Sequence, residues 1–230
     1  MKKIVVLTGA GISAESGLKT FRDSNGLWRN YRFEEVASPE AWARDPGLVL
    51  EFYNIRRKQL LEVEPNAAHR ALVHLEEKYD VRIVTQNVDD LHERAGSKNV
   101  LHIHGELRKA RSTADPSLIY DIDGWELKWG DKCEKGSQLR PHVVWFGEPV
   151  ELMPRAEELM RQADILMVIG TSLVVYPAAG LIFDVEAGVP KYYVDPNAGN
   201  IGGIKNLTPV AGKAAEVLPG LVERLLMEQP

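Results

Sequence analysis

The sequence predicts an α/β fold, a Rossmann-like doubly wound parallel sheet that carries a smaller inserted domain. Short β-branched runs alternate with longer segments that have apolar residues at three- and four-residue spacing, which is typical of a parallel sheet covered by helices. A glycine-containing turn directly follows the first run. With 230 residues, 44% of them hydrophobic, the chain is long enough for one sizeable core and a smaller appended module.

The individual elements follow from these patterns. Strands are expected at the β-branched runs 3–7, 81–85, 99–103, 143–146, 165–169 and 191–194. Helices are expected at 46–63, 65–78, 154–163, 177–188 and 212–227. Several of these helical segments begin with proline, which the first turn of a helix tolerates well.

Two stretches interrupt the alternation. Residues 26–64 show no strand pattern, and residues 107–140 are polar, with Trp125 and Trp129 as the main expected apolar anchors. The expected domains are a Rossmann-like domain and a small domain built from a helical insertion and a small module. The first comprises residues 1–28, 67–106 and 141–230, and the second comprises 29–66 and 107–140.

Charge and hydropathy exclude several functional classes. The chain has 28 basic and 33 acidic residues, so no overall field attracts nucleic acid or an anionic membrane. No apolar run approaches the roughly 20 residues that span a bilayer. The single cysteine, Cys133, excludes an internal disulfide and fits a reducing compartment. We expect a cytoplasmic protein that binds neither nucleic acid nor a membrane.

A dinucleotide-type turn follows the first strand. It has the form GxGxxA, and its residues include Gly9, Ala10, Gly11, Ser13 and Ala14. In such turns the glycines permit a tight bend and a close approach of the backbone to a pyrophosphate, and unpaired amides at the helix start bind the anion. A tight strand-to-helix turn without any ligand has the same pattern.

The residues after this turn differ from those of a dehydrogenase. A hydride-transferring enzyme should continue through a long helix into a second strand, which ends in an acidic residue about 20 positions on. Here Gly17 cuts the helix short, and Phe21 and Arg22 follow in a loop that is suited to cover a nucleotide. The pattern favours a dinucleotide that is consumed rather than reduced.

Polar side chains follow two later strands. Gln86, Asn87 and Asp89 come after the strand 81–85, and His104 comes after the strand 99–103. Because ligands bind beyond the carboxyl ends of parallel strands, we expect these residues to converge on the glycine turn. Asn87 and Asp89 can bind a carboxamide, and His104 is a candidate general base. A purely structural histidine is the alternative at position 104.

Five motifs that cover almost the whole chain resemble those of one family. They read GAGISAESGLKTFRDSNGLW, TQNVDDLHERAG, HIHGEL, RPHVVWFGE and GTSLVVYPAAGL. Together they look like the sirtuins, the NAD-dependent protein lysine deacylases. The resemblance implies a cleft between two domains that holds NAD and an acyl-lysine. It also implies attack of the acyl oxygen on C1′ of the nicotinamide ribose, with nicotinamide and O-acyl-ADP-ribose as products.

The resemblance also implies a role for individual residues. His104 would deprotonate a ribose hydroxyl, with Asn87 and Asp89 as the other catalytic residues, at the nicotinamide pocket. The implied NAD-binding residues are Gly9, Ala10, Gly11, Ser13, Ala14, Glu15, Phe21, Arg22, Trp28, Gln86, Asn87, Val88, Asp89, Gly170, Thr171, Ser172, Tyr193, Asp195 and Ala214. The substrate backbone would add as a strand beside Val143, Trp145, Phe146 and Gly147.

The sequence departs from the sirtuin pattern at two places. Most sirtuins carry two CxxC pairs that bind zinc, whereas this chain has Ser112 and Asp115 at the first pair and only Cys133 of the second. We therefore expect no zinc, because a structural site needs four closed ligands; a metal on Asp115, Cys133 and a histidine is the alternative. Near the adenosine, Tyr193 stands two residues before Asp195, where sirtuins usually have asparagine.

The segment EFYNIRRKQLL predicts which acyl group is removed. Tyr53 and Arg56 are three residues apart and share a helix face, and a sirtuin subgroup that removes succinyl and malonyl groups carries this pair. A guanidinium binds a carboxylate bidentately, and a phenol can add a third hydrogen bond. An ordinary solvated arginine is the alternative, and Arg57 is expected to point elsewhere.

Several functions remain open from the sequence. The favoured one is removal of succinyl or malonyl groups, and also acetyl groups, from lysines of extended protein segments. The alternatives are a plain deacetylase, a mono-ADP-ribosyltransferase and an NAD sensor without turnover. A monomer is the favoured oligomeric state.

Overall fold

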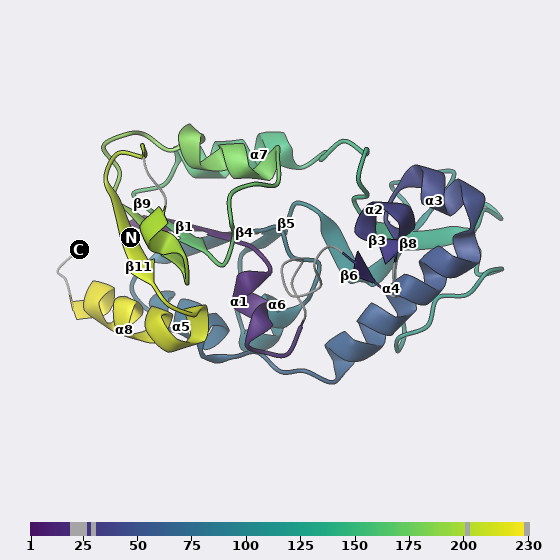
Figure 1. The fold of residues 1–230 in the computed structure, drawn as a ribbon, viewed down its shortest axis with the longest axis horizontal. Coiled ribbons are helices and arrows are strands. Elements are labelled where there is room, and N and C mark those ends of the chain that lie inside the picture. Colours follow the sequence, from purple (N-terminus) through teal and green to yellow (C-terminus); the bar gives the residue numbers. More distant parts are fainter. Residues whose placement is uncertain (19–26, 29–30, 201–202, 228–230) are drawn as a thin grey trace.

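The computed structural model describes residues 1–18, 27–28, 31–200 and 203–227. It confirms the predicted α/β class, because a parallel sheet of six strands with helices on both faces forms the larger part of the molecule. A smaller antiparallel sheet lies at the other end, with α2, α3 and α4 beside it (Figure 1). None of the described helices is long and apolar enough to cross a bilayer.

The large sheet has the strand order β11-β10-β9-β1-β4-β5, and all its pairs are parallel. The strands are β1 (Lys3–Thr8), β4 (Asp80–Thr85), β5 (Val100–His102), β9 (Ile165–Ile169), β10 (Lys191–Asp195) and β11 (Leu207–Ala211). The sequence missed β11, which lies at the edge of the sheet and contains Pro209, a residue that central strands exclude. Because β9, β1 and β4 are neighbours, their carboxyl ends meet at one place.

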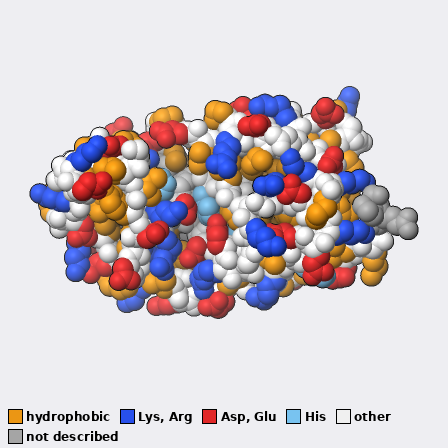
Figure 2. Space-filling view, turned by 180° about the vertical axis from the view of Figure 1, so that it is seen from behind, with side chains coloured by type: hydrophobic (Ala, Val, Ile, Leu, Met, Phe, Trp, Pro, Cys, Tyr) orange, Lys and Arg blue, Asp and Glu red, His pale blue; other side chains and the backbone are white. Residues whose placement is uncertain are grey.

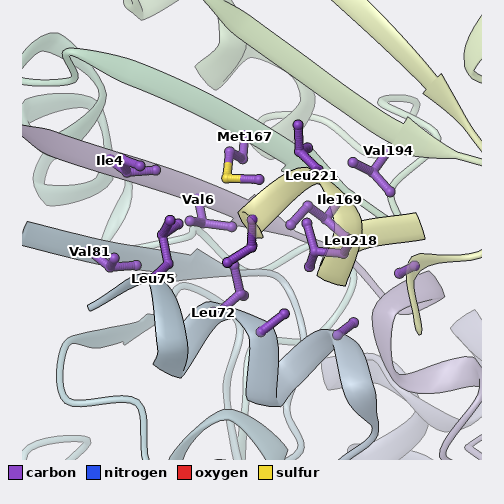
Figure 3. Close-up of a cluster of buried hydrophobic side chains, with 14 of the residues drawn as sticks. Ile4, Val6, Leu72, Leu75, Val81, Met167, Ile169, Val194, Leu218 and Leu221 are labelled. Atoms are coloured by element: carbon purple, nitrogen blue, oxygen red, sulfur yellow. The ribbon is translucent and has the colours of Figure 1, made fainter. Parts of the chain in front are cut away.

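Helices cover both faces of this sheet. One face is covered by α5 (Ala67–Leu75) and α8 (Ala214–Met227), whose apolar side chains pack on those of β1, β4 and β9 (Figure 3). The other face is covered by α7 (Met153–Arg161) and by η1 (Ala178–Asp184). The prediction of an α-helix at 177–188 was wrong, because η1 is a 3-10 helix of seven residues. Short elements complete this part, namely α1 (Gly11–Ala14), α6 (Leu91–Ala95) and η2 (Ala198–Asn200).

The smaller part combines helices with the antiparallel sheet β7-β6-β8. Its elements are β2 (Leu27–Trp28), β3 (Tyr31–Arg32), α2 (Phe33–Val36), α3 (Pro39–Arg44), α4 (Pro46–Leu61), β6 (Gly105–Ser112), β7 (Ile119–Asp121) and β8 (Leu139–Val143). The short antiparallel pair β2 and β3 corrects the expectation of no strand in 26–64. The expected strand 143–146 is also wrong, because β8 ends at Val143 and pairs antiparallel with β6.

Aliphatic residues, and not the two tryptophans, anchor the 107–140 module. Trp125 is 38% exposed and Trp129 is 65% exposed. The buried contacts come instead from Ala110, Ile122 and Leu127, which pack on Leu50 of α4. The Asn54 side chain bonds both the backbone N–H and the backbone C=O of Leu127, which fixes the module to α4.

Candidate active site

Two turns interlock where β1 and β9 end. Gly9 N–H donates to Ile169 O at 3.0 Å, and Gly11 N–H donates to Gly170 O at 2.8 Å. A Cβ on Gly9 would lie 2.7 Å from Thr171 Cβ, and one on Gly11 would lie 2.7 Å from Gly170 Cα. The glycines are therefore required for the approach of one turn to the other, a reason that the motif alone does not reveal.

The amides of the glycine turn differ from the expectation of unpaired donors. Gly9 and Gly11 donate to the neighbouring turn, Ile12 N–H donates to Gly9 O, and Ser13 N–H donates to Ala10 O. The expectation was therefore wrong for the helix-start amides of Gly11, Ile12 and Ser13, because the second turn and the short α1 already provide acceptors. Glu15 also faces the protein, since its Oε2 accepts from Ala215 N–H at 2.8 Å in the first turn of α8, next to the buried Ala214.

Asn87, Asp89 and Ser13 form one hydrogen-bonded group below the turn. Asn87 Nδ2 donates to Gly9 O at 3.1 Å and to Ser13 Oγ at 3.2 Å, and Ser13 Oγ donates to Asp89 Oδ2 at 3.0 Å. Burial raises the pKa of Asp89, although the bonds from Ser13 and from the amide of Leu91 favour its charged form. The structure thus brings together the two residues expected to bind a carboxamide. Val88 lies between them, half-buried, and its O accepts from Leu107 N–H.

A buried chain of hydroxyl groups supports this loop and was missed from the sequence. Thr8 Oγ1 lies 3.1 Å from His92 Nε2 and donates to Thr85 Oγ1 at 2.7 Å. Thr85 Oγ1 in turn accepts from Asn87 N–H at 3.0 Å. The signal was a threonine at the last position of both β1 and β4, next to the two motifs. This chain fixes the point where the β4 loop leaves the sheet.

Gln86 and Tyr193 hold the turn that follows β9. Gln86 Nε2 donates to Thr171 Oγ1 at 3.1 Å, and the Tyr193 hydroxyl donates to Thr171 O at 2.9 Å. Tyr193 is only 4% exposed, so its side chain lies inside the fold next to this turn. Asp195 is also buried, and its Oδ1 accepts from Asn197 N–H. Ser172, the next residue of the turn, is half-buried.

His104 is held in one tautomer by a backbone carbonyl. Its Nδ1 lies 3.0 Å from Gln86 O, so Nδ1 must carry the proton that it donates, and Nε2 is left as the basic atom. Burial lowers the pKa of His104, against a smaller opposing effect of the bond to Gln86 O. The imidazole is therefore neutral at physiological pH, which is the state that a general base requires.

Tyr53 and Arg56 lie on one face of α4, as the spacing predicted. Tyr53 is 1% exposed, and burial raises its pKa to about 12, although the nearby Arg56 and Trp145 oppose the shift. Arg56 is half-buried, and its guanidinium carbon lies 5.5 Å from the centre of the Phe52 ring. Burial lowers the pKa of Arg56, while Tyr53 and Asp89 favour its charged form. The charge of Arg56 therefore interacts with the carboxylate of Asp89. Arg57 points elsewhere, as expected, and the structure shows that it bonds carbonyls of the 107–140 module.

The segment after β8 is fixed by an arginine and a glutamate. Arg140 donates to Glu148 and to Val143 O, and Glu148 also accepts from Trp145 N–H at 2.8 Å. Arg140 stacks on the Trp145 ring at 3.2 Å. Val143 and Trp145 are buried, whereas Phe146 is 40% exposed and Gly147 is exposed with a φ of +92°. The sequence analysis did not predict this supporting pair.

The remaining predicted residues and surfaces are placed as follows. Phe21 and Arg22 lie outside the described residues, as does the side chain of Trp28. The face opposite to that of Figure 1 is hollowed near its centre, and histidine side chains lie in the hollow (Figure 2). A cavity of about 250 Å³ is lined by Val143 and also by Ile103 and Gly105, the two chain neighbours of His104. Within the described part of the chain, no group of three or more His, Cys, Asp or Glu side chains is arranged to hold a metal.

Comparison with known proteins agrees with this geometry. The Sir2 family model matches residues 9–177. An NAD-dependent protein deacylase of Helicobacter pylori is 52% identical over 228 residues, which cover 98% of each chain. A Sir2 homologue solved with NAD has a TM-score of 0.88 at 43% identity and covers 98% of this chain and 90% of its own. A mutant Sir2 homologue solved with 2′-O-acetyl ADP ribose has the same TM-score at 42% identity and covers 98% and 92%. The chain therefore belongs to the Sir2 family.

Proposed function

We propose that the protein is an NAD-dependent protein lysine deacylase that transfers the acyl group to ADP-ribose. The observation that carries the proposal is the neutral His104, whose Nε2 is available as a base near the Asn87 and Asp89 group. The relatives named above support it, because one is named a deacylase and others were solved with NAD and with an acetylated ADP ribose.

The proposed roles follow from what each group can donate or accept. NAD is a substrate, and the turns at 9–14 and 170–172 hold its phosphates and riboses. Asn87 and Asp89 bind the nicotinamide carboxamide, which offers both a donor and an acceptor. The acyl oxygen of the substrate attacks C1′ as the bond to nicotinamide breaks. His104 Nε2 then takes the proton of a ribose hydroxyl, so that this oxygen attacks the acyl carbon. The lysine amine leaves this carbon, and water adds to it, which breaks its bond to the C1′ oxygen and gives O-acyl-ADP-ribose.

We further propose that acidic acyl groups, succinyl and malonyl, are preferred over acetyl. The cation of Arg56 is half-buried next to the neutral phenol of Tyr53 and makes no salt bridge to a described residue. A partly desolvated guanidinium gains most from a carboxylate that approaches it with two oxygens. Acetyl offers no such partner, so the Tyr53 and Arg56 pair discriminates between the two groups.

The decisive experiment measures kcat/KM on matched succinyl-lysine and acetyl-lysine peptides. Arg56→Met should lower the ratio of the two values by about 10- to 100-fold, the equivalent of about 1.5–3 kcal/mol for bonds to a charged group. Lys58→Met is the matched control, because Lys58 is an exposed cation two residues away and should leave the ratio unchanged. An unchanged ratio in Arg56→Met refutes the acyl preference but leaves the deacylase proposal intact.

Product analysis separates the proposal from its rivals. Mass spectrometry should find nicotinamide and O-acyl-ADP-ribose in equal amounts, whereas a mono-ADP-ribosyltransferase modifies a protein. Acetyl removal without succinyl removal would indicate a plain deacetylase. Nicotinamide release that persists unchanged in His104→Ala would refute the role of this histidine, and its absence in the wild type would indicate an NAD sensor.

We also propose that the 107–140 module holds together without zinc. Cys133 Sγ donates to Ser112 Oγ at 3.3 Å, and Lys135 Nζ donates to Asp115 Oδ2 at 2.7 Å. These contacts join the same two chain segments that zinc joins in the four-cysteine relatives. Elemental analysis of the purified protein should find less than one zinc in ten chains. One zinc per chain, lost with the fold on chelation, would refute this proposal.

A further inference from the structure

A second histidine lies two residues before the proposed base and has a different environment. His102 is the last residue of β5 and is 8% exposed. Its Nδ1 lies 2.9 Å from Asn87 O, and its Nε2 lies 2.8 Å from Glu93 Oε1. One imidazole ring thus spans the loop that begins at Asn87, contains Asp89 and continues into α6.

The partners of His102 fix its protonation state. A backbone carbonyl and a carboxylate only accept hydrogen bonds, so both ring nitrogens must carry a proton to satisfy them. A ring with two N–H groups is an imidazolium. Burial alone lowers the pKa of His102, but the bond and charge of Glu93, with the bond to Asn87 O, outweigh it and raise the pKa. The pKa of Glu93 is correspondingly lowered by His102, against the effect of its own burial.

We propose that His102, as a charged imidazolium paired with Glu93, is a positioning residue that holds Asn87 and Asp89 in register for the nicotinamide end of NAD. The inference rests on the proposed NAD site but adds a residue outside it. The ring joins the carbonyl of Asn87 to Glu93, six residues on, so Asp89 lies between its two anchors. Loss of either anchor frees one end of the loop.

His102 and His104 therefore have different protonation states, and each can be tested by itself. His104 is bonded by one acceptor and stays neutral, whereas His102 is bonded by two acceptors and stays charged. The other charged or titratable groups that act on His102 or Glu93 are Glu106 of β6, Lys109 of β6, Asp89 of the loop, His92 of α6 and His69 of α5. The carboxylates favour the imidazolium, and Lys109 is itself paired with Glu106 at 2.9 Å. As pH rises through the folded pKa of His102, the ring loses one proton. One of its two hydrogen bonds, to Asn87 O or to Glu93, is then lost.

The experiment follows KM for NAD and inhibition by nicotinamide against pH in three variants. His102→Gln keeps one donor and no charge, and Glu93→Gln keeps the imidazole but removes its counter-charge. His74→Gln is the matched control, because His74 forms the same kind of pair with Glu77 at 2.9 Å on the exposed end of α5. Thermal unfolding of each variant is measured in parallel.

In the wild type, KM for NAD should rise at alkaline pH. This rise should move to lower pH by about one unit in Glu93→Gln, because the carboxylate no longer favours the charged ring. In His102→Gln the rise of KM at alkaline pH should vanish. At neutral pH, KM and the nicotinamide inhibition constant should both be raised about tenfold or more, while kcat should change less. His74→Gln should match the wild type throughout.

Two results would overturn the inference. One is a pH profile of KM that is the same in Glu93→Gln as in the wild type. This variant keeps the test decisive even if His102→Gln fails to fold, because the side chain of Glu93, although partly buried against His102, is 42% exposed. The other is a His102→Gln variant whose unfolding temperature falls while its KM for NAD and its nicotinamide inhibition constant stay at the wild-type values. A wild type that consumes no NAD would instead refute the proposed function itself.

Discussion

Replacing Arg57 with methionine tests how α4 is attached to the 107–140 module. The fully buried Arg57 donates from Nε to Leu107 O and from Nη1 to Trp125 O and Asn54 Oδ1, each at 2.7 Å. Methionine fills much of the space but leaves the buried carbonyl of Leu107 and the part-buried carbonyl of Trp125 without this donor, at about 1–3 kcal/mol each, with the lower value expected at Trp125. The lost cation offsets part of this cost, because its Nη2 has no hydrogen-bond partner among the described residues. We expect the free energy of unfolding to fall by about 3 kcal/mol.

Arg56→Met is the matched control for this measurement, because it changes the same residue type one position away. The structure shows no hydrogen bond from Arg56 to a described residue, so the control should lose less than about 1 kcal/mol. Urea unfolding followed by tryptophan fluorescence gives both values, and the melting temperature of Arg57→Met should fall by about 6–12 °C. The reasoning is refuted if Arg57→Met stays within about 1 kcal/mol of the wild type, or if Arg56→Met is the less stable variant.

Three further predictions concern the site and the core. His104→Ala should lower kcat for deacylation by about 100- to 10,000-fold while calorimetry still detects NAD binding, and near-normal turnover would contradict its role as the base. Gly170→Ala should weaken NAD binding and stability, because its Cβ would lie 2.6 Å from Gly11 C at a φ of +62°. Gly188→Ala should be neutral, because no described atom lies within 4 Å of its Cβ. Burial lowers the pKa of His69 to about 4, so the unfolded chain binds more protons than the native one between pH 6.5 and 4. The free energy of unfolding should therefore fall by up to about 3 kcal/mol as pH drops through this window, and acid titration of His69→Gln should show a shallower fall.

The sequence predicted the central sheet well because its strands are buried on both faces. Such strands consist of continuous Val, Ile and Leu, as in β1 and β9, and need no knowledge of their neighbours. β11 lacks this pattern, since it is half-exposed at the edge and contains Pro209. The small sheet was missed for a related reason. The pairing of β6 with β8 is interrupted between Gly105 and Ala110, which disturbs the alternation that marks a surface strand.

The sequence predicted the part of the site that lies at the carboxyl ends of the strands. The rule that ligands bind at the carboxyl edge placed Gln86, Asn87, Asp89 and His104 together without any side-chain contact being known. It did not show that Tyr193 turns inward, because the acceptor of its hydroxyl, Thr171 O, belongs to a turn 22 residues away in the chain. Contacts between distant turns depend on the assembled sheet, and no local pattern records them.

Arg56 and Arg57 show how one position along a helix separates two functions. Successive residues of an α-helix are about 100° apart around its axis, so one guanidinium faces Tyr53 and Asp89 while the other faces the carbonyls of the module. Because α4 carries the proposed acyl-recognition pair and is fixed to the module through Arg57, movement of the module also displaces Tyr53. An Arg57 variant that remains folded should therefore lose part of its preference for succinyl along with its stability. The Arg56 variant should lose the preference alone, and this asymmetry follows from the direction of each side chain rather than from its charge.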